Sequence, residues 1–557
     1  MIVTPSAARG LAAWAHRAAR TARFLAALGM TIAMSCATTN QPMLDLKITN
    51  GRIVDGTGAP WYRGDVGVRG DRIVSIGDLS NVSATTTIDA HDQVVSPGFI
   101  DLLGQDQQAV FIEPTLEAKV RQGVTSELTG EGTSPGPSKS GKWKTLGEYL
   151  DAIDKQGSAI NFGLLVGASN PREMLIGDVN RPPTLAEQEE MNRIIAQAMN
   201  DGAIGISTSL IYLPAMYSTT DEIVSMAKVA SRAGGVYFTH MRDEGDHIDV
   251  GLDEAFRIGK EANIPVNIWH LKVGGPANWG KMPHVIARIE EARVEGIDAA
   301  ANVYPYIASS TGLSTLIPNW ALEGGYAAMQ DRLKDPEQRA KIAEALRAQL
   351  AKRRERGIYI TRIDNAAFES YQAKFVEEIA AAMNFAPEEA LMKLFAETKA
   401  SPSVIFFSMN EDDVQFALKQ PWMSVGSDSS SPVKHARDTN AATHPRAYGT
   451  FSRVAGHYVR DVRLFSLEEA VRKMTSQAAD RATFIDRGVL RPGMTADIVV
   501  FDPATIADTA TFENPNHFST GVTDVIVNGV IVLRNGAVTG ALPGRTIRGR
   551  GWKKANS

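Results

Sequence analysis

The middle of the chain alternates short apolar runs with longer amphipathic segments. Eight of these runs have the length of buried strands, and each is followed by a loop and a stretch of helical periodicity. Repeated strand–helix units predict a parallel sheet covered by helices. We expect the strands at Phe99–Ile100, Thr125–Leu128, Phe162–Val166, Gly205–Ile206, Val236–Thr239, Val266–Trp269, Asp298–Val303 and Met423–Gly426. Eight such units, without a glycine-rich phosphate fingerprint after an early strand, predict an α/β fold, a (β/α)8 TIM-like barrel.

The two ends of the chain have a different pattern, in which apolar and polar residues alternate over short stretches broken by turns. Asn-Gly pairs at Asn528 and Asn535 are typical of hairpins. We expect strands at Asp45–Val54, Asp71–Gly77, Ala496–Phe501, Val522–Gly529 and Val530–Gly536. The pattern predicts one small β-sandwich built from both ends of the chain, from residues 42–98 and 479–557.

Residues 99–478 then form the barrel, with a charged helical insertion at about residues 320–410. Charged runs of this kind are usually the solvated faces of helices. A lid over the barrel mouth is the other interpretation of this insertion.

The composition fits a folded globular protein, with 44% hydrophobic and 22% charged residues. The net charge of −5 and the lack of a basic stripe give no reason to expect a nucleic-acid partner.

The N-terminal 36 residues have the layout of a signal peptide. Four arginines precede a short apolar run, Phe24–Met34, which is too short to span a bilayer. Small residues then lead to Cys36, the single cysteine, in a context that resembles a bacterial lipobox. We expect an exported, periplasmic lipoprotein with a lipid anchor at Cys36; a plain secretory signal is the alternative. The rest of the chain contains no thiol, so neither a disulfide nor a thiolate metal ligand is expected in it.

Polar residues directly follow several of the predicted strands, where barrel enzymes gather their active sites. They are Glu131, His240, His270, Tyr304 and Asp428, with Arg242 and Lys272 close by. A single histidine in such a place is more often a hydrogen-bonded core residue. Two histidines with a carboxylate, however, leave a fourth position open for water, as at catalytic zinc. We therefore expect one Zn²⁺ ion at Glu131, His240 and His270, which lowers the pKa of a water molecule toward about 7.

The remaining polar residues suggest roles in proton transfer and substrate binding. Asp428 is expected to act as general base and then general acid, although its Ser-Asp-Ser context also suits a plain turn. Lys272 and Arg446 offer cationic partners for a substrate carboxylate, and Tyr304 and Tyr306 offer hydroxyl donors.

Several motifs together resemble the amidohydrolase superfamily, and within it the D-aminoacylase group of N-acyl-D-amino-acid deacylases. The resemblance covers nearly the whole chain from about residue 44 and rests on Pro97–Asp101 (PGFID), Gly205–Thr208 (GIST), Tyr212–Pro214 (YLP), Thr239–Glu244 (THMRDE), His270–Lys272 (HLK), Tyr304–Tyr306 (YPY), Gly426–Asp428 (GSD), His444–Phe451 (HPRAYGTF) and Met494–Phe501 (MTADIVVF). It implies a barrel with a composite β-sandwich, zinc, and hydrolysis of N-acylated D-amino acids. It also implies that His240 and His270 bind metal, that Asp428 is catalytic, and that Lys272, Arg446 and a tyrosine among Tyr212, Tyr304 and Tyr306 bind the substrate carboxylate.

The sequence departs from this family at three positions. The usual His-x-His pair falls at Leu103 and Gln105, and Glu131 stands where the deacylases often have cysteine. Ala168 occupies the place of a further expected histidine. The resemblance therefore implies a site for one metal ion.

The predicted function is hydrolysis of the amide bond of an N-acyl-D-amino acid, or of a dipeptide ending in a D-residue. The substrate would be a small molecule with a free carboxylate. Two alternatives remain open: a cyclic-amide hydrolase of the hydantoinase or dihydroorotase kind, and a ligand-binding lipoprotein without catalytic activity.

Overall fold

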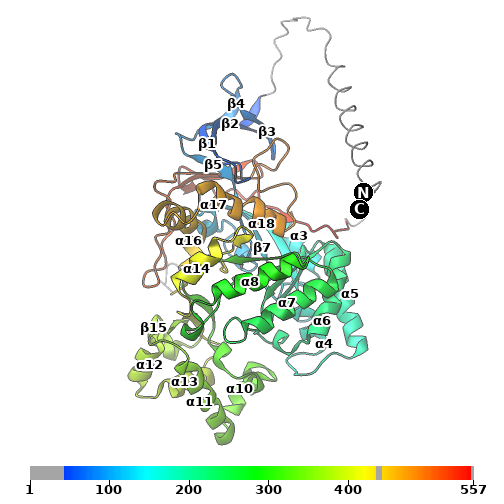
Figure 1. Cartoon of the computed structure of the whole chain (residues 1–557), viewed down its shortest axis with the longest axis vertical. Coiled ribbons are helices and arrows are strands. Elements are labelled where there is room, and N and C mark those ends of the chain that lie inside the picture. Colours follow the sequence, from blue (N-terminus) through cyan, green and yellow to red (C-terminus); the bar gives the residue numbers. More distant parts are fainter. Residues whose placement is uncertain (1–42, 435–441, 554–557) are drawn as a thin grey trace, which may run out of the picture. The chain divides into compact units, whose positions relative to one another are not determined.

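Eight parallel strands form a barrel (Figure 1). They are β6 (Phe99–Asp101), β7 (Val124–Thr129), β8 (Asn161–Gly167), β9 (Gly205–Ser209), β10 (Val236–His240), β11 (Val266–Ile268), β12 (Ala299–Val303) and β17 (Met423–Val425). Their order around the sheet is their order in the chain, and a parallel bridge between Gly104 and Ser429 connects the segments after the first and last strands. All eight predicted strands are confirmed. They were recognisable because strands buried on both faces are continuous apolar runs.

The structure is a computed structural model that describes residues 43–434 and 442–553. The predicted signal segment and Cys36 lie outside the described residues. Among the residues that the structure does describe, no helix combines the length and apolar character needed to cross a membrane.

Helices follow the barrel strands and cover them from outside. They are α2 (Glu117–Val120), α3 (Leu146–Gln156), α4 (Ser169–Leu175), α5 (Leu185–Asp201), α6 (Thr220–Arg232), α7 (Ile248–Ala262), α8 (Met282–Val294), α14 (Glu411–Leu418), α16 (Arg446–Arg453), α17 (Leu467–Met474) and α18 (Ser476–Arg481). Local sequence fixes where some of them begin. Thr145 and Thr184 each form a capping box with a glutamate three residues later, which satisfies free N–H groups of α3 and α5.

The two ends of the chain join in one β domain, as the alternating pattern predicts. Its strands are β1 (Leu44–Ile53), β2 (Tyr62–Arg69), β3 (Arg72–Gly77), β4 (Ala84–Asp89), β5 (Val94–Pro97), β18 (Ile498–Phe501), β19 (Val522–Val527), β20 (Val530–Arg534) and β21 (Ala537–Val538). β5 pairs antiparallel with β18, so strands from both ends form one hydrogen-bonded sheet. Its apolar side chains, including Leu46, Val66 and Ile498, pack into a shared core. The last strand, β22 (Thr546–Ile547), pairs with barrel strand β8 instead.

The segment between β12 and β17 forms a small subdomain, which we call the insertion. A four-stranded antiparallel sheet in the order β13-β16-β14-β15 carries five helices and a core that includes Leu346 and Phe395. Its elements are β13 (Ser309–Gly312), α9 (Asn319–Leu322), α10 (Gly325–Arg332), α11 (Pro336–Ala351), β14 (Ile358–Arg362), β15 (Lys374–Phe375), α12 (Val376–Met383), α13 (Pro387–Glu397) and β16 (Ser403–Phe406). The sequence predicts its helices but not its sheet, whose strands are short and far apart in the chain.

A buried lysine connects the first barrel strand to the loop after the last one. Lys119 of α2 donates to Asp101 Oδ2 at 2.6 Å, to Ser427 Oγ at 2.9 Å and to the Ser429 carbonyl at 2.9 Å. The side chains of Lys119 and Asp101 have no solvent exposure. Ser427 also donates its backbone N–H to Asp101 at 2.8 Å. This network fixes the loop that carries Asp428.

Replacing Lys119 with methionine is expected to lower the free energy of unfolding by about 3–5 kcal/mol, because it leaves buried carboxylates without their counter-ion. Asp101, Asp106 and Glu127 all lie within 3.7 Å of the lysine nitrogen. Urea denaturation followed by tryptophan fluorescence measures the change. Lys341→Met is the control, since Lys341 forms an exposed i,i+4 pair. Equal effects of the two substitutions would contradict a structural role for the buried network.

Candidate active site

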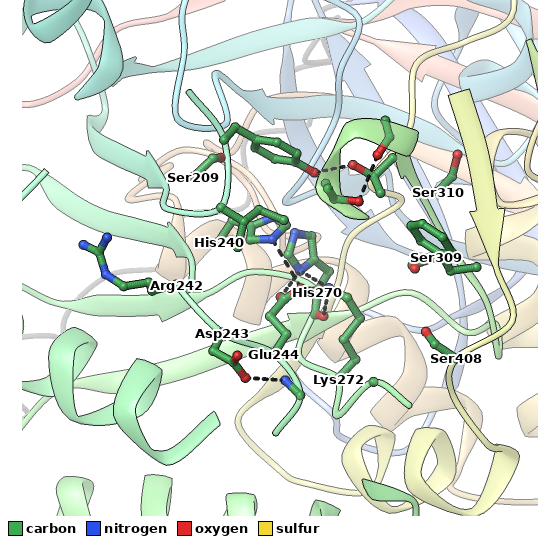
Figure 2. A pocket seen from close by; sticks show the side chains of 18 of the residues that line it. Ser209, His240, Arg242, Asp243, Glu244, His270, Lys272, Ser309, Ser310 and Ser408 are labelled. Atoms are coloured by element: carbon green, nitrogen blue, oxygen red, sulfur yellow. Dashed lines mark hydrogen bonds and ion pairs between the residues drawn. The ribbon is translucent and has the colours of Figure 1, made fainter. Parts of the chain in front are cut away.

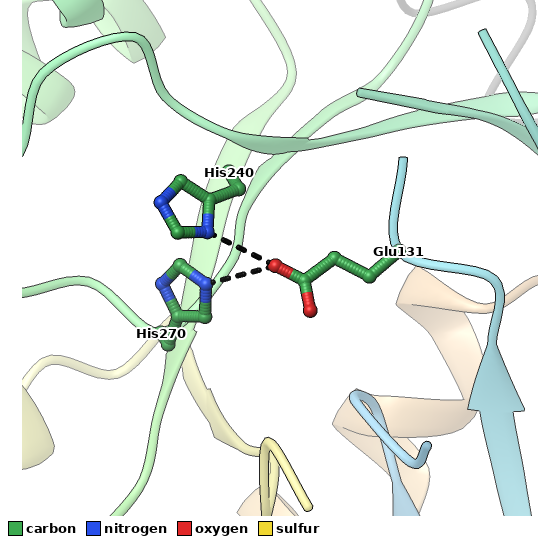
Figure 3. Close-up of side chains that lie close together, drawn as sticks. All are labelled: Glu131, His240 and His270. Atoms are coloured by element: carbon green, nitrogen blue, oxygen red, sulfur yellow. Dashed lines mark hydrogen bonds and ion pairs between the residues drawn. The ribbon is translucent and has the colours of Figure 1, made fainter. Parts of the chain in front are cut away.

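Glu131, His240 and His270 converge at the C-terminal end of the barrel (Figure 3). Glu131 Oε1 lies 3.0 Å from His240 Nδ1 and 3.2 Å from His270 Nε2. The three donor atoms are within 4.8 Å of one another. Two imidazoles and one carboxylate that point at a common place suit a divalent metal ion such as Zn²⁺, with a further position open. The structure thus brings together the three predicted ligands, which follow or end strands β7, β10 and β11.

The glycines on either side of Glu131 allow its loop to approach the barrel closely. Gly130 has φ 98° and Gly132 has φ 65°, in the region that disfavours other residues. A Cβ atom at Gly130 would lie 2.4 Å from the Leu165 carbonyl oxygen, and one at Gly132 would lie 2.5 Å from the Ser209 side chain. No side chain fits at either position.

Two of the predicted site residues have unusual backbone conformations. His270 has φ 36° and Asp428 has φ 51°. Positive φ is uncommon for residues other than glycine, and such conformations cluster at functional sites. Hydrogen bonds hold both segments: Asn302 Oδ1 accepts from the His270 backbone N–H at 2.7 Å, and the Leu103 carbonyl accepts from that of Asp428 at 2.9 Å.

Glu244, for which the sequence predicts no role, contacts the outer nitrogen of each histidine. Its carboxylate lies 3.3 Å from His240 Nε2 and 3.0 Å from His270 Nδ1. An outer carboxylate of this kind fixes the orientation and tautomer of metal-binding histidines. Its position four residues after His240, in the same loop, was the one available signal.

Lys272 lies against this carboxylate rather than free in the cavity (Figure 2). Its Nζ is 2.6 Å from Glu244 Oε2 and 2.8 Å from His270 Nδ1. If His270 held an ion through Nε2, its Nδ1 would carry a proton, and Glu244 rather than Lys272 could accept that proton in a hydrogen bond. Burial raises the pKa of Glu244, but the nearby histidines and Lys272 outweigh it and hold that pKa well below its usual range.

Asp428 is held by two polar partners beside the metal ligands. Gln105 Nε2 lies 2.9 Å from Asp428 Oδ1 and 2.9 Å from Glu131 Oε2, so one amide group bridges both carboxylates. Arg446 Nη1 lies 2.8 Å from Asp428 Oδ2. Burial raises the pKa of Asp428, although the charges of Arg446 and His270 oppose this effect. From the sequence, Gln105 is expected only to leave one position of the His-x-His pair without a metal ligand.

A cavity of about 1050 Å³ opens above these residues. Glu131, His240, His270, Lys272 and Asp428 all line it, and Tyr212 joins them. Hydroxyl groups are frequent on its wall. Ser209, Ser309, Ser310 and Ser408 are labelled in Figure 2, and Thr311 and Thr315 also line the cavity. The insertion contributes part of the wall through Gln349, Lys352, Arg353 and Phe406.

The predicted substrate-binding residues fall into two groups. Tyr212 lines the cavity and shares a 2.6 Å hydrogen bond with Thr311. Arg446, Tyr304 and Tyr306 are buried and are absent from the cavity lining in the described part of the chain. The Arg446 guanidinium lies 4.6 Å from the Tyr304 ring centre, and the Tyr306 hydroxyl donates to Asp508 at 3.3 Å. Tyr306 is therefore engaged with a residue outside the cavity.

Metal affinity should rise with pH up to about pH 9. Burial and Lys272 lower the pKa of His270, but Glu244, Asp428 and the Glu131 hydrogen bond outweigh them and raise it to about 9. The metal competes with a proton below this pH, so the apparent Kd should rise about tenfold for each unit that the pH falls. Competition with a zinc-binding dye between pH 6.5 and 8.5 measures this. A pH-independent Kd would show that His270 does not bind the ion.

Glu244→Gln should weaken metal binding about 10–100-fold without abolishing it, because the amide cannot accept and balance the histidine protons as the carboxylate does. Dye competition gives the Kd. Asp243→Asn is the matched control, since Asp243 Oδ1 accepts hydrogen bonds only from the backbone N–H groups of Gly245 and His247. Equal Kd values for the two variants would contradict this role of Glu244.

Comparison with known proteins places the site in a family. Residues 142–533 match the model of the Amidohydrolase family. A D-aminoacylase of Alcaligenes xylosoxydans xylosoxydans is 38% identical over 525 residues, which cover 91% of this chain and 98% of that protein.

Solved structures agree. A crystal structure of D-aminoacylase is 37% identical with a TM-score of 0.78, over 91% of this chain and 100% of that one. The N-acyl-D-glutamate deacylase of Bordetella bronchiseptica, in complex with zinc and a phosphonate inhibitor, is 33% identical with the same TM-score and coverage. An L-hydantoinase of Arthrobacter aurescens, at 15% identity and a TM-score of 0.56, shares the fold alone. With three candidate metal ligands that converge in a barrel and these matches over most of its length, the chain belongs to the amidohydrolase family.

Proposed function

We propose that the protein is a metal-dependent hydrolase that cleaves the amide bond of N-acyl-D-amino acids, or of dipeptides ending in a D-residue. The observation that carries this proposal is the convergence of three metal donors and Asp428 in one cavity. The relatives named as D-aminoacylase and N-acyl-D-glutamate deacylase support the D-configuration and the linear amide.

Each group of the site has a definite task in this reaction. An ion held by Glu131, His240 and His270 would polarise a carbonyl and lower the pKa of water when bound. Asp428 accepts the proton of the attacking water and delivers it to the departing amine nitrogen. Gln105 holds Oδ1 of Asp428, so the carboxylate stays directed at the reaction centre.

We expect one ion, and Zn²⁺ in particular. Leu103 is fully buried and apolar, and Gln105 places its amide between Glu131 and Asp428. The Gln105 N–H₂ group donates to both carboxylates and so takes the place where a second metal cation would neutralise them. These two residues stand where the His-x-His pair of the superfamily is expected.

The substrate carboxylate is assigned to Lys272, Arg446 and the neighbouring tyrosines. Lys272 and Tyr212 line the cavity. Arg446 Nε is buried and has no hydrogen-bond partner among the described residues, so it retains donor capacity. A small shift of its guanidinium away from Asp428 would present a bidentate fork to a carboxylate, with Tyr304 beneath it.

The location of the protein is a separate proposal. The segment 1–36 supports export to the periplasm, with a lipid anchor at Cys36. Peptides and acylated amino acids of the cell envelope would then be within reach.

Hydrolysis of matched N-acetyl-D- and N-acetyl-L-amino acids by protein lacking residues 1–36 tests the proposal, together with metal analysis. We expect about one zinc per chain and cleavage of the D-series. Asp428→Asn should lower kcat about 10²–10⁴-fold while zinc stays bound.

Asp246→Asn serves as the control, because Asp246 lines the outer cavity and pairs with Lys352. Zinc without cleavage of linear amides would favour a cyclic-amide substrate. Absence of both zinc and turnover would favour a ligand-binding protein.

A further inference from the structure

One arginine of the cavity has no anionic partner in the part of the chain that the structure describes. Four lysine and arginine side chains line the cavity in the described part of the chain, and three of them form ion pairs: Arg242 with Glu254 at 2.9 Å, Lys272 with Glu244 at 2.6 Å and Lys352 with Asp246 at 2.8 Å. For Arg353, no carboxylate of the described residues lies within ion-pair distance. Among the described residues, Arg353 is therefore the cavity-lining cation without a carboxylate partner.

The guanidinium of Arg353 is held in place by neutral groups. Its Nη1 donates to the Gln349 carbonyl at 2.6 Å and to Gln349 Oε1 at 3.2 Å. Its guanidinium carbon lies 5.0 Å from the ring centre of Phe406, at the end of β16. These contacts come from α11 on one side and the insertion sheet on the other, so they fix the plane of the group.

The contacts leave one edge of the guanidinium open. Nε and Nη2 have no hydrogen-bond partner among the described residues, and neither is among the atoms sealed from solvent. This is the edge that binds a carboxylate through two parallel hydrogen bonds. Burial lowers the pKa of Arg353, which reflects a cation partly removed from water. An anion at this edge would offset that cost.

The contacts of Arg353 differ from those of the residues assigned to the reacting amide. The carboxylate next to the scissile bond is assigned to Lys272, which contacts the metal ligand His270 directly. Arg353 belongs to the insertion and contacts none of the predicted metal ligands. Its ligand would therefore be a different group on the same substrate.

We propose that the open edge of Arg353 forms a subsite for a second carboxylate of the substrate, carried either by the side chain of the D-amino acid or by the acyl group. The inference rests on the proposed function and narrows it to acidic substrates. A substrate with an acidic side chain, such as an N-acyl-D-glutamate, and a substrate with a dicarboxylic acyl group would both present a carboxylate to Arg353. Substrates that carry the second carboxylate either on the side chain or on the acyl group, but not on both, distinguish these two alternatives.

The test compares each acidic substrate with a neutral counterpart of similar shape. N-acetyl-D-glutamate and N-acetyl-D-glutamine probe the side chain, and N-succinyl-D-methionine and N-butyryl-D-methionine probe the acyl group. Arg353→Met should lower the acidic-to-neutral ratio of kcat/KM about 10–100-fold in one of the two pairs, mainly through KM, as expected for loss of charged hydrogen bonds. Lys352→Met is the matched control, because Lys352 is adjacent and cationic but already paired.

Two outcomes overturn the inference. An unchanged ratio in both pairs would show that Arg353 takes no carboxylate, and so would an equal loss with Lys352→Met. A calorimetric titration separates failure of the subsite from failure of the proposed function. It measures binding of N-acetyl-D-glutamate and N-succinyl-D-methionine to Asp428→Asn protein with and without Arg353→Met. If binding depends on Arg353 but the wild-type protein cleaves no acylated D-amino acid, the subsite stands and the proposed reaction fails.

Discussion

The contact of Glu131 Oε1 with His240 and His270 depends on the arrangement of the whole barrel. Glu131, His240 and His270 come from three strands that span about 140 residues, yet their donor atoms meet within 4.8 Å. Such a meeting requires β7, β10 and β11 to end at one level of the barrel. The barrel must also be closed, and Lys119 contributes to this by joining the first strand to the loop after the last one. The same network fixes Asp428 beside the ligands.

Charge balance explains how so many ionisable groups share one buried place. Glu131, Glu244 and Asp428 face two histidines, Lys272 and Arg446, and each carboxylate has a cationic or hydrogen-bonding partner. Burial alone would raise the pKa of every carboxylate. The histidines instead lower the pKa of Glu131 and Glu244, so both remain anionic. His270 has a pKa raised to about 9, so an ion that takes its place at these donors would displace a proton, and this couples metal binding to proton release.

Gln105 shows how a departure from a family motif can be accommodated. Its amide bridges Glu131 and Asp428, two carboxylates that would otherwise repel each other across a buried gap. The insertion forms another part of the cavity wall, to which Arg353 and Phe406 contribute. The candidate metal donors thus follow or end barrel strands, whereas part of the opposite cavity wall belongs to the insertion.

The sequence by itself determined the barrel and the β domain built from both ends, and it predicted that Glu131, His240 and His270 would lie together. Strands buried on both faces are continuous apolar runs, and the polar residues that follow them must gather at one edge. It could not determine which polar groups pair there. Gln105 and Asp428 are 323 positions apart, and only closure of the barrel brings them to 2.9 Å. Arg446 lies against Asp428, and Tyr306 against Asp508, for the same reason. Side-chain pairing over such separations depends on the packing of whole elements, which no local pattern of residues encodes.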